Sequence, residues 1–184
     1  MRRVFYFVIL FTGLQASAQK AGLTFQTSVQ GGLLEGERGS AFQLQTINGF
    51  KHKTWAAGVG VGLDYYHTRS IPLFLNLRKS FSDNSKTPFL YLSGGYHFPW
   101  LKEEDKYWGE TKADGGLYMD AGIGYQVSFM KKSALFFSAG YSQKNYSRTE
   151  TDGIVIAIWP MPAPQSRKFD FDLRRLSIQT GLRF

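Results

Sequence analysis

The fold is decided by the last nine residues, Leu176-Ser177-Ile178-Gln179-Thr180-Gly181-Leu182-Arg183-Phe184. Apolar residues or threonine occupy the even positions, and polar or small residues occupy the odd ones. This alternation predicts a β-strand with one apolar face. At the end of a soluble protein, such a strand would expose both that face and an unpaired edge. We therefore expect the terminal strand to pair with another strand in a closed sheet.

The N-terminus has the three regions of a secretory signal peptide. Met1-Arg2-Arg3 is basic, residues 4–14 are mostly apolar, and Ala16-Ser17-Ala18 has the small residues of a cleavage site. The apolar run is shorter than the roughly 20 residues that a membrane-spanning helix needs. We predict that residues 1–18 are a signal peptide and that residues 19–184 form a single domain.

Composition and charge narrow the class of protein. Aromatic residues make up 16% of the chain and there are 20 glycines, a mixture that disfavours long helices. The net charge is +8, or +6 without Arg2 and Arg3. An exported chain does not ordinarily meet nucleic acid, so we expect no nucleic-acid partner and assign the charge to anionic lipid headgroups, saccharides or general solubility. The absence of cysteine excludes disulfides and cysteine nucleophiles.

Eight segments of the mature chain alternate with a period of two. They span residues 22–34, 41–51, 55–65, 71–78, 87–100, 116–130, 133–146 and 168–184. For 87–100 we prefer an outward face that carries Leu90, Leu92, Tyr96 and Phe98. The phase of 133–146 stays open because both of its faces hold aromatic residues.

Residues 55–65 are the most informative segment. One face carries bulky side chains from Trp55 to Tyr65, whereas the other is mostly glycine, at positions 58, 60 and 62. Glycine makes neither a good solvent face nor a good core. It suits a cramped barrel interior or a close approach of another backbone.

The connections are of two kinds. Those after the second, fourth and sixth segments are short, whereas residues 101–115 and 147–167 form long loops. The prolines at 160, 162 and 164 exclude an ordinary β-ladder in the second loop. In the last segment the apolar positions change from odd to even, which predicts a β-bulge at Arg174-Arg175.

Together these features predict an all-β protein, an eight-stranded antiparallel up-and-down transmembrane β-barrel. An even strand number, short periplasmic turns, longer outer loops and apolar-out alternation are typical of such barrels. Sheets cross lipid only when closed, because every backbone polar group needs a partner inside the protein. The alternative is a secreted lipocalin-like barrel, which would expose the glycine face of 55–65 to water.

Aromatic residues are expected at the two rims of the barrel. We expect Phe50, Trp55, Phe89, Phe129 and Phe184 at the periplasmic rim and Tyr65, Trp100, Trp108, Tyr118 and Tyr141 at the outer rim.

The chain resembles the small eight-stranded bacterial outer-membrane β-barrels of the OmpA/OmpX-like type. The resemblance rests on the signal peptide, the repeated alternation and the terminal Leu182-x-Phe184. It implies localisation in the bacterial outer membrane, contact with outer-membrane lipids, and recognition of Leu182 and Phe184 by the barrel-assembly machinery. The consensus glycine of that signal falls at position 179, which is Gln179 here.

The interior of an eight-stranded barrel is just filled by side chains, so we expect no wide pore. The polar residues expected inside are Asp64, Asn76, Arg78, Asp120, Gln126, Arg175 and Arg183. Charges of both signs in a confined interior must pair, because unpaired buried charges are strongly unfavourable. We interpret this set as a structural ion-pair core, and a catalytic acid-base pair is the alternative.

Catalytic and metal-binding patterns are weak. Ser93 and His97 with Asp120 are the best local candidates for a nucleophile and base, but residues four apart on one strand lie about 13 Å apart. The three histidines have no metal-ligand spacing. We therefore predict no catalytic, cofactor-binding or metal-binding residues and no cofactor.

The apolar run at residues 154–159 is unusual for a surface loop. Its Ile154, Ile156, Ile158 and Trp159 form a lid, an extended hairpin or a contact site for an unidentified extracellular partner. We favour a non-enzymatic role that is structural, adhesive or surface-interacting. The alternatives are a lipid-modifying enzyme and a narrow channel for small solutes.

Overall fold

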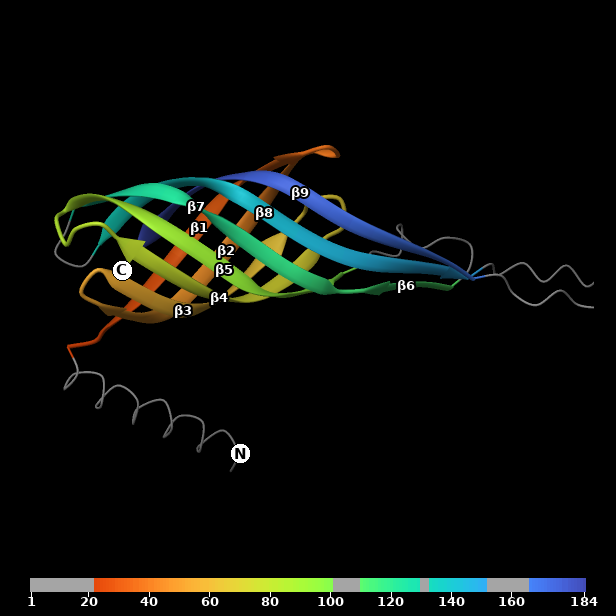
Figure 1. Ribbon diagram of the computed structural model, residues 1–184, viewed down its shortest axis with the longest axis horizontal. Coiled ribbons are helices and arrows are strands. Elements are labelled where there is room, and N and C mark those ends of the chain that lie inside the picture. The colour runs from red at the N-terminus through yellow and green to blue at the C-terminus, as the bar shows by residue number, and fades with distance from the viewer. Residues whose placement is uncertain (1–21, 101–109, 130–132, 152–165) are drawn as a thin grey trace, which may run out of the picture.

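The structure is a computed structural model that describes residues 22–100, 110–129, 133–151 and 166–184 (Figure 1). The described residues form the strands β1 (Thr24–Gly36), β2 (Gly39–His52), β3 (Trp55–Asp64), β4 (Ser70–Ser80), β5 (Lys86–Pro99), β6 (Glu110–Asp114), β7 (Gly116–Ser128), β8 (Ala134–Thr151) and β9 (Ser166–Arg183). No helix in the described part of the chain is long and apolar enough to cross a membrane.

The sheet closes into an antiparallel barrel of eight strands. β6 and β7 both pair with β8 and form one strand interrupted at Gly115, and β1 pairs with β9 to complete the ring. The stagger of the strands can be followed from Thr24 by stepping from each residue to its paired residue on the next strand. After one full circuit of the ring, this path returns to β1 at Leu34, ten residues after Thr24. Such a stagger accompanies the strand tilt of a closed barrel. The predicted fold class is confirmed.

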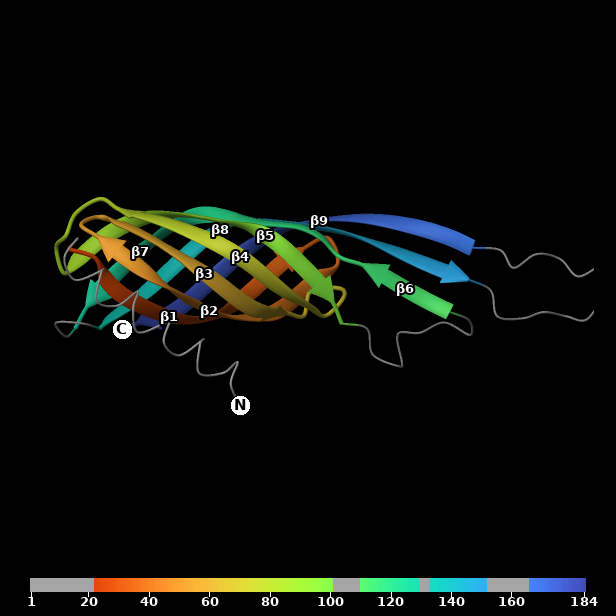
Figure 2. The ribbon, with the colours of Figure 1, turned by 90° about the horizontal axis from the view of Figure 1, so that it is seen from below.

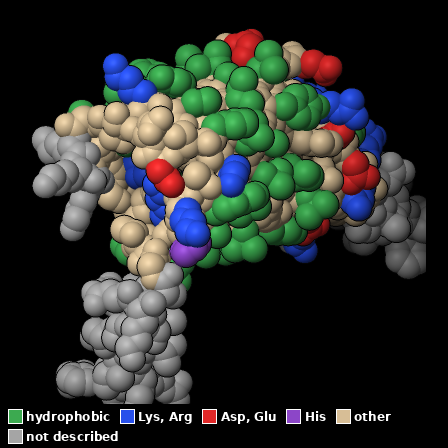
Figure 3. All heavy atoms as spheres, turned by 60° about the vertical axis from the view of Figure 1, so that its left-hand side comes forward, with side chains coloured by type: hydrophobic (Ala, Val, Ile, Leu, Met, Phe, Trp, Pro, Cys, Tyr) green, Lys and Arg blue, Asp and Glu red, His purple; other side chains and the backbone are tan. Residues whose placement is uncertain are grey.

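The barrel has an apolar outer wall and a largely polar interior. Leu75, Leu117, Ile123 and Ile178 are each more than 60% exposed on the wall. Figure 3 shows hydrophobic side chains gathered over one face of the wall, with most charged side chains towards its ends. This is the reverse of a soluble barrel, and an apolar band of this kind is typical of contact with lipid.

The two doubtful strand phases are resolved by burial. In β5, Leu90, Leu92, Tyr96 and Phe98 face outward, so the preferred phase of residues 87–100 is confirmed. In β8, the even positions from Ala134 to Tyr146 face inward. Two predicted rim aromatics are wrong, because Phe89 and Tyr118 lie on the inward faces of β5 and β7 and are only 2% and 1% exposed. Trp108 lies outside the described residues.

The predicted bulge at Arg174-Arg175 is also wrong. β9 keeps a single register against β8 from Ser166 to Arg183. The apolar positions change because Phe171 and Leu173 point inward and pack at the barrel mouth with Leu34, Tyr66 and Tyr146.

The register shift lies instead between β6 and β7. Asp114 pairs with Ser147 but Tyr118 pairs with Lys144, so the chain gains one residue at Gly115-Gly116. A Cβ at Gly115 would lie 2.0 Å from the His97 carbonyl oxygen, which only glycine avoids. The predicted 101–115 loop is therefore shorter, because residues 110–114 form β6.

Three strands continue beyond the barrel rim as a ribbon. β8 and β9 each have 18 residues, whereas β1 ends opposite Arg175. We call the three-stranded part formed by residues 110–114, 145–151 and 166–174 the ribbon (Figures 1 and 2). The end of the barrel beside it is the ribbon end, and the end with Phe184 and the short turns is the turn end. Since short turns of such barrels lie in the periplasm, we assign the ribbon end to the cell surface.

Candidate functional site

The seven polar residues predicted inside the barrel all lie on inward faces. Asp64, Arg78, Asp120, Gln126, Arg175 and Arg183 are buried, and Asn76 is half-buried. They do not form one ion-pair cluster. They fall into three groups, at the ribbon end, the centre and the turn end of the interior.

Asp64 organises the group at the ribbon end. Its Oδ2 lies 2.5 Å from Arg175 Nη1 and 3.2 Å from Lys144 Nζ. Lys144 also donates to the Ser70 hydroxyl and the Thr68 carbonyl, each at 3.1 Å. All three ionic side chains are at most 2% exposed, so two cations that share one carboxylate fill this end of the lumen.

Asp120 lies at the centre and is held by neutral donors. Tyr91 and Ser177 donate to its Oδ1 at 3.0 and 3.1 Å, and Gln179 donates to its Oδ2 at 2.9 Å. Gln179 in turn accepts a bond from Gln30, which connects Asp120 to a chain of buried amides. Among the described residues, Asp120 has no cation within ion-pair distance.

The group at the turn end is cationic. Arg78 Nη2 and Arg183 Nη1 both donate to Gln126 Oε1, at 3.4 and 2.7 Å. The guanidinium of Arg78 stacks on Phe89, with its Cζ 3.2 Å from the ring centroid. Among the described residues, neither arginine has a carboxylate within ion-pair distance, and Arg78 Nε, Arg183 Nε and Arg183 Nη2 are buried without a hydrogen-bond partner.

Sequence reasoning missed four functional contacts of the interior. Lys144 completes the Asp64 group, and Tyr91, Tyr118 and Ser177 surround Asp120. Lys144 can be placed in the lumen only if the inward face of β8 is known, and aromatic residues on both faces of that strand hide which face is inward.

The candidate catalytic residues do not form a hydrogen-bonded triad, although Ser93 lies directly opposite Asp120 in the pairing of β5 with β7. The Ser93 hydroxyl accepts a bond from Asn76 Nδ2 at 2.9 Å, whereas His97 Nε2 contacts the Asn145 carbonyl oxygen at 2.9 Å. Within the described ranges, no group of His, Asp and Glu side chains could hold a metal ion.

The predicted assembly residues lie at the turn end. Leu182 faces outward, and Phe184 is 53% exposed and exchanges two backbone hydrogen bonds with Thr27. The predicted loop contact residues Ile154, Ile156, Ile158 and Trp159 lie outside the described residues.

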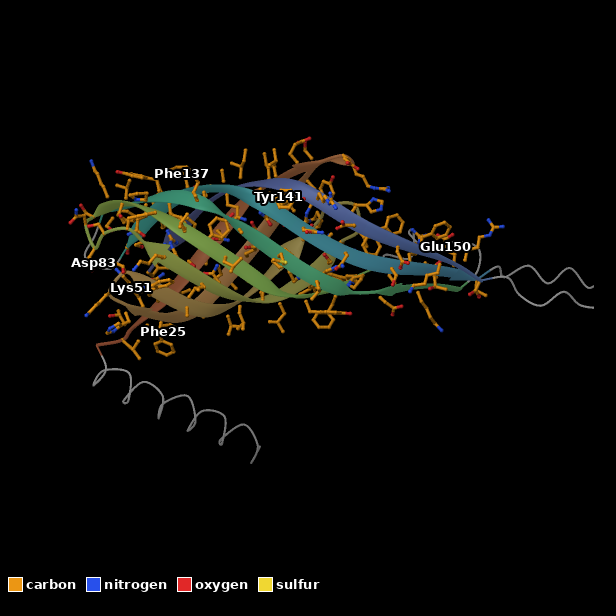
Figure 4. All side chains as sticks on the ribbon, viewed as in Figure 1. Phe25, Lys51, Asp83, Phe137, Tyr141 and Glu150 are labelled. Carbon is orange, nitrogen blue, oxygen red and sulfur yellow. The ribbon has the colours of Figure 1, made fainter. Side chains whose placement is uncertain are left out.

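The ribbon differs chemically from the barrel wall. On the outer face of β9 the wall carries Leu176, Ile178 and Leu182, whereas the ribbon carries charges of both signs. Lys168–Asp170 and Arg174–Asp172 form exposed ion pairs at 3.6 and 3.3 Å. Such a polar surface belongs in water or headgroups, not in the hydrocarbon region. In Figure 4, Glu150 lies far along the ribbon, and Lys51 and Asp83 lie at the opposite end.

A histidine lies at the outer mouth among several cations. His67 has a left-handed backbone (φ 59°), and its ring lies 5.4 Å from that of Phe171. Partial burial, and then the nearby cations Arg38, Lys144 and Arg148, lower the pKa of His67 below its usual value.

Solved structures share this fold. OprG from Pseudomonas aeruginosa aligns with 89% of this chain and 96% of its own at 12% identity and a TM-score of 0.60. A major outer membrane protein from Thermus thermophilus aligns with 88% of this chain and 99% of its own at 13% identity and a TM-score of 0.52. Neisserial surface protein A covers 88% of this chain and 96% of its own at 14% identity and a TM-score of 0.50. No protein-family model and no curated protein matches the chain.

These likenesses, at low identity, are likenesses of fold. Together with the closed ring, the apolar wall and the polar interior, they define the class: the chain is a small integral β-barrel protein of the bacterial outer membrane. Its wall contacts the lipids of that membrane.

Proposed function

We propose that the protein is a non-conducting membrane anchor that presents the ribbon at the cell surface for adhesion or for contact with an extracellular partner. The observation that carries this proposal is the continuation of β6, β8 and β9 beyond the rim. Strands of 18 residues extend for roughly 60 Å, whereas crossing a bilayer takes roughly 9–11 tilted residues. Much of the hairpin therefore serves something other than crossing the membrane.

The occupied lumen supports the same proposal. The Asp64 group and the apolar cluster of Leu34, Tyr66, Tyr146 and Leu173 lie across the interior at the ribbon end. An aqueous path through this end would require the separation of a buried ion pair, which is strongly unfavourable. Barrels of eight strands are in general filled in this way.

A shortened hairpin tests the surface role. Ser147 and Asp170 face each other in register, so Asn-Gly can replace residues 148–169 as a two-residue turn. This variant keeps Tyr146 and Phe171, whose rings stack at 4.8 Å over the mouth. Cells that display the full chain should adhere to abiotic surfaces or host matrix, and cells that display the shortened variant should lose this adhesion.

The control is a full-length hairpin in which Lys168→Gln and Asp170→Asn remove one exposed ion pair of the ribbon. Circular dichroism melts must show that all three barrels fold. Equal adhesion of the shortened and full-length chains would refute the proposal, and stepwise currents in planar bilayers would refute a non-conducting barrel.

Recognition of Leu182 and Phe184 by the assembly machinery forms part of this proposal. Both side chains lie exposed at the turn end. Phe184→Ala should reduce outer-membrane insertion in cells while the purified chain still refolds in detergent. Unchanged insertion would exclude this role for Phe184.

A further inference from the structure

The turn-end half of the lumen contains a cavity of about 30 Å³. Its polar lining comes from Gln26, Ser28, Gln30, Asn76, Arg78, Tyr91, Ser138 and Gln179. No aspartate or glutamate lines it. Cavities of this size hold roughly two waters or one ion of similar volume.

Hydrogen-bond donors face this cavity without protein partners. Arg78 is only 7% exposed, and within the described part of the chain its single hydrogen bond is the 3.4 Å contact with Gln126 and its Nε has no partner. Among the described residues, the hydroxyls of Ser28 and Ser138 have no hydrogen-bond partner either, although both residues are buried. A buried cation flanked by free hydroxyls is the usual protein environment of a bound anion.

The local charge is uncompensated. Arg183 shares the Gln126 oxygen with Arg78, so two guanidinium groups meet one neutral acceptor. The face of Phe89 stabilises Arg78 but does not neutralise it. At the opposite end of the lumen, each cation of the Asp64 group has a carboxylate partner.

Access comes from the turn end. Along the inward face of β1, Gln26 is half-buried, whereas Ser28 and Gln30 are buried. Beyond Gln30, the linked amides of Gln30, Gln45 and Gln179 cross the lumen and close the cavity on the ribbon side. Among the described residues, exposure along this face therefore increases towards the turn end, which makes the periplasmic side the shorter route to the cavity.

We propose that this cavity is a binding site for one small monovalent inorganic anion of about the size of chloride, held by Arg78 with the hydroxyls of Ser28 and Ser138. The site is independent of the ribbon and of any surface role. The small volume favours a chloride-sized ion over sulfate, phosphate or an organic acid, and a lining with Arg78 and without a carboxylate disfavours a cation.

Bromide provides the direct test. Crystals of the wild-type protein grown or soaked in sodium bromide should show one anomalous peak in contact with the Arg78 guanidinium. The peak should be absent from Arg78→Gln and retained in Arg174→Gln, a matched control whose arginine is exposed on the ribbon. Water alone in the wild-type cavity would overturn the proposal.

Unfolding in detergent provides the second test. Chloride at ten times its Kd should raise the folded-to-unfolded ratio of the wild type about elevenfold relative to gluconate at equal ionic strength. Arg174→Gln should respond equally, and Ser138→Ala should need more chloride for the same shift. If Arg78→Gln does not fold, the proposal is tested by the chloride dependence of Ser138→Ala unfolding and by the bromide peak in the wild-type crystals. An equal effect of sulfate at matched ionic strength, or no weakening in Ser138→Ala, would overturn the proposal.

Discussion

The two ends of the barrel interior handle buried charge in opposite ways. At the ribbon end, Asp64 pairs with Arg175 and Lys144. At the turn end, Arg78 and Arg183 share one amide oxygen and stack on aromatic rings. The first arrangement gives both cations an ionic contact with the same carboxylate, although Arg175 Nε has no hydrogen-bond partner among the described residues. The second leaves donors unpartnered beside a cavity, so it is the end at which a solute can bind.

Because of this difference, removing a charged side chain should change the stability of the barrel by different amounts at the two ends. Removal of the only carboxylate from a buried group leaves its cations uncompensated, which is strongly destabilising. Removal of a cation that lacks a carboxylate takes away an ion whose burial was already unfavourable. The same type of residue should therefore be critical at one end and dispensable at the other.

The largest effect is expected for Asp64→Asn. Arg175 and Lys144 would then lie buried without a counterion, so the free energy of unfolding should fall by about 3–5 kcal/mol. Urea titration of the refolded barrel in detergent measures this. Asp172→Asn is the control: it removes the exposed ion pair with Arg174 and should change stability by about 0–1 kcal/mol. Similar losses in the two variants would contradict a critical role for the buried group.

An intermediate effect is expected for Asp120→Asn. The amide keeps one acceptor oxygen, but its NH₂ must face a donor such as Gln179 Nε2 or the Tyr91 hydroxyl. The free energy of unfolding should fall by about 1–3 kcal/mol, because one buried donor loses its acceptor and no cation is stranded. The same urea titration measures it, with Tyr91→Phe as the milder companion. A loss as large as that of Asp64→Asn would mean that Asp120 neutralises a cation at a distance.

The barrel wall could be predicted from the sequence because its signal is local. In residues 55–65, every second side chain is bulky and the others are small, and lipid contact follows from that alternation without knowledge of any partner strand. The inward positions of Asp64, Arg78 and Asp120 follow from the same rule. The alternation of residues 176–184, from which closure of the sheet was predicted, belongs to the part of β9 that lies in the barrel wall.

The interior contacts could not be predicted because they depend on register between distant strands. Asp64 and Arg175 are 111 residues apart, and only the pairing of the whole ring brings them together. The false bulge had a related cause. Phe171 and Leu173 are apolar residues on an inward face, since the mouth of the lumen is apolar while its middle is polar. A change of environment along one straight strand looks, in sequence, like a change of phase.

A small effect is expected for Arg183→Met at the turn end. This arginine has two buried nitrogens without partners, and Gln126 keeps Arg78 as a donor when it is removed. Stability should change by no more than about 1 kcal/mol, in either direction, whereas Arg175→Met should cost several times as much. Melting of both variants in one detergent compares them directly. Equal destabilisation would remove the contrast between the two ends.

The smallest effect concerns pH at the outer mouth. Because the pKa of His67 is lowered in the folded state, the folded protein binds its proton less readily than the unfolded chain. Stability associated with His67 is therefore fully present above its unfolded pKa near 6.5 and is lost as pH falls below that value. His67→Asn keeps a residue that tolerates the left-handed backbone and removes the titration. In melts between pH 8 and pH 5, the wild type should lose slightly more stability than this variant, while His52→Asn, at an exposed turn-end position, should follow the wild type. Parallel curves for all three would show that protonation of His67 is not coupled to the cations of the mouth.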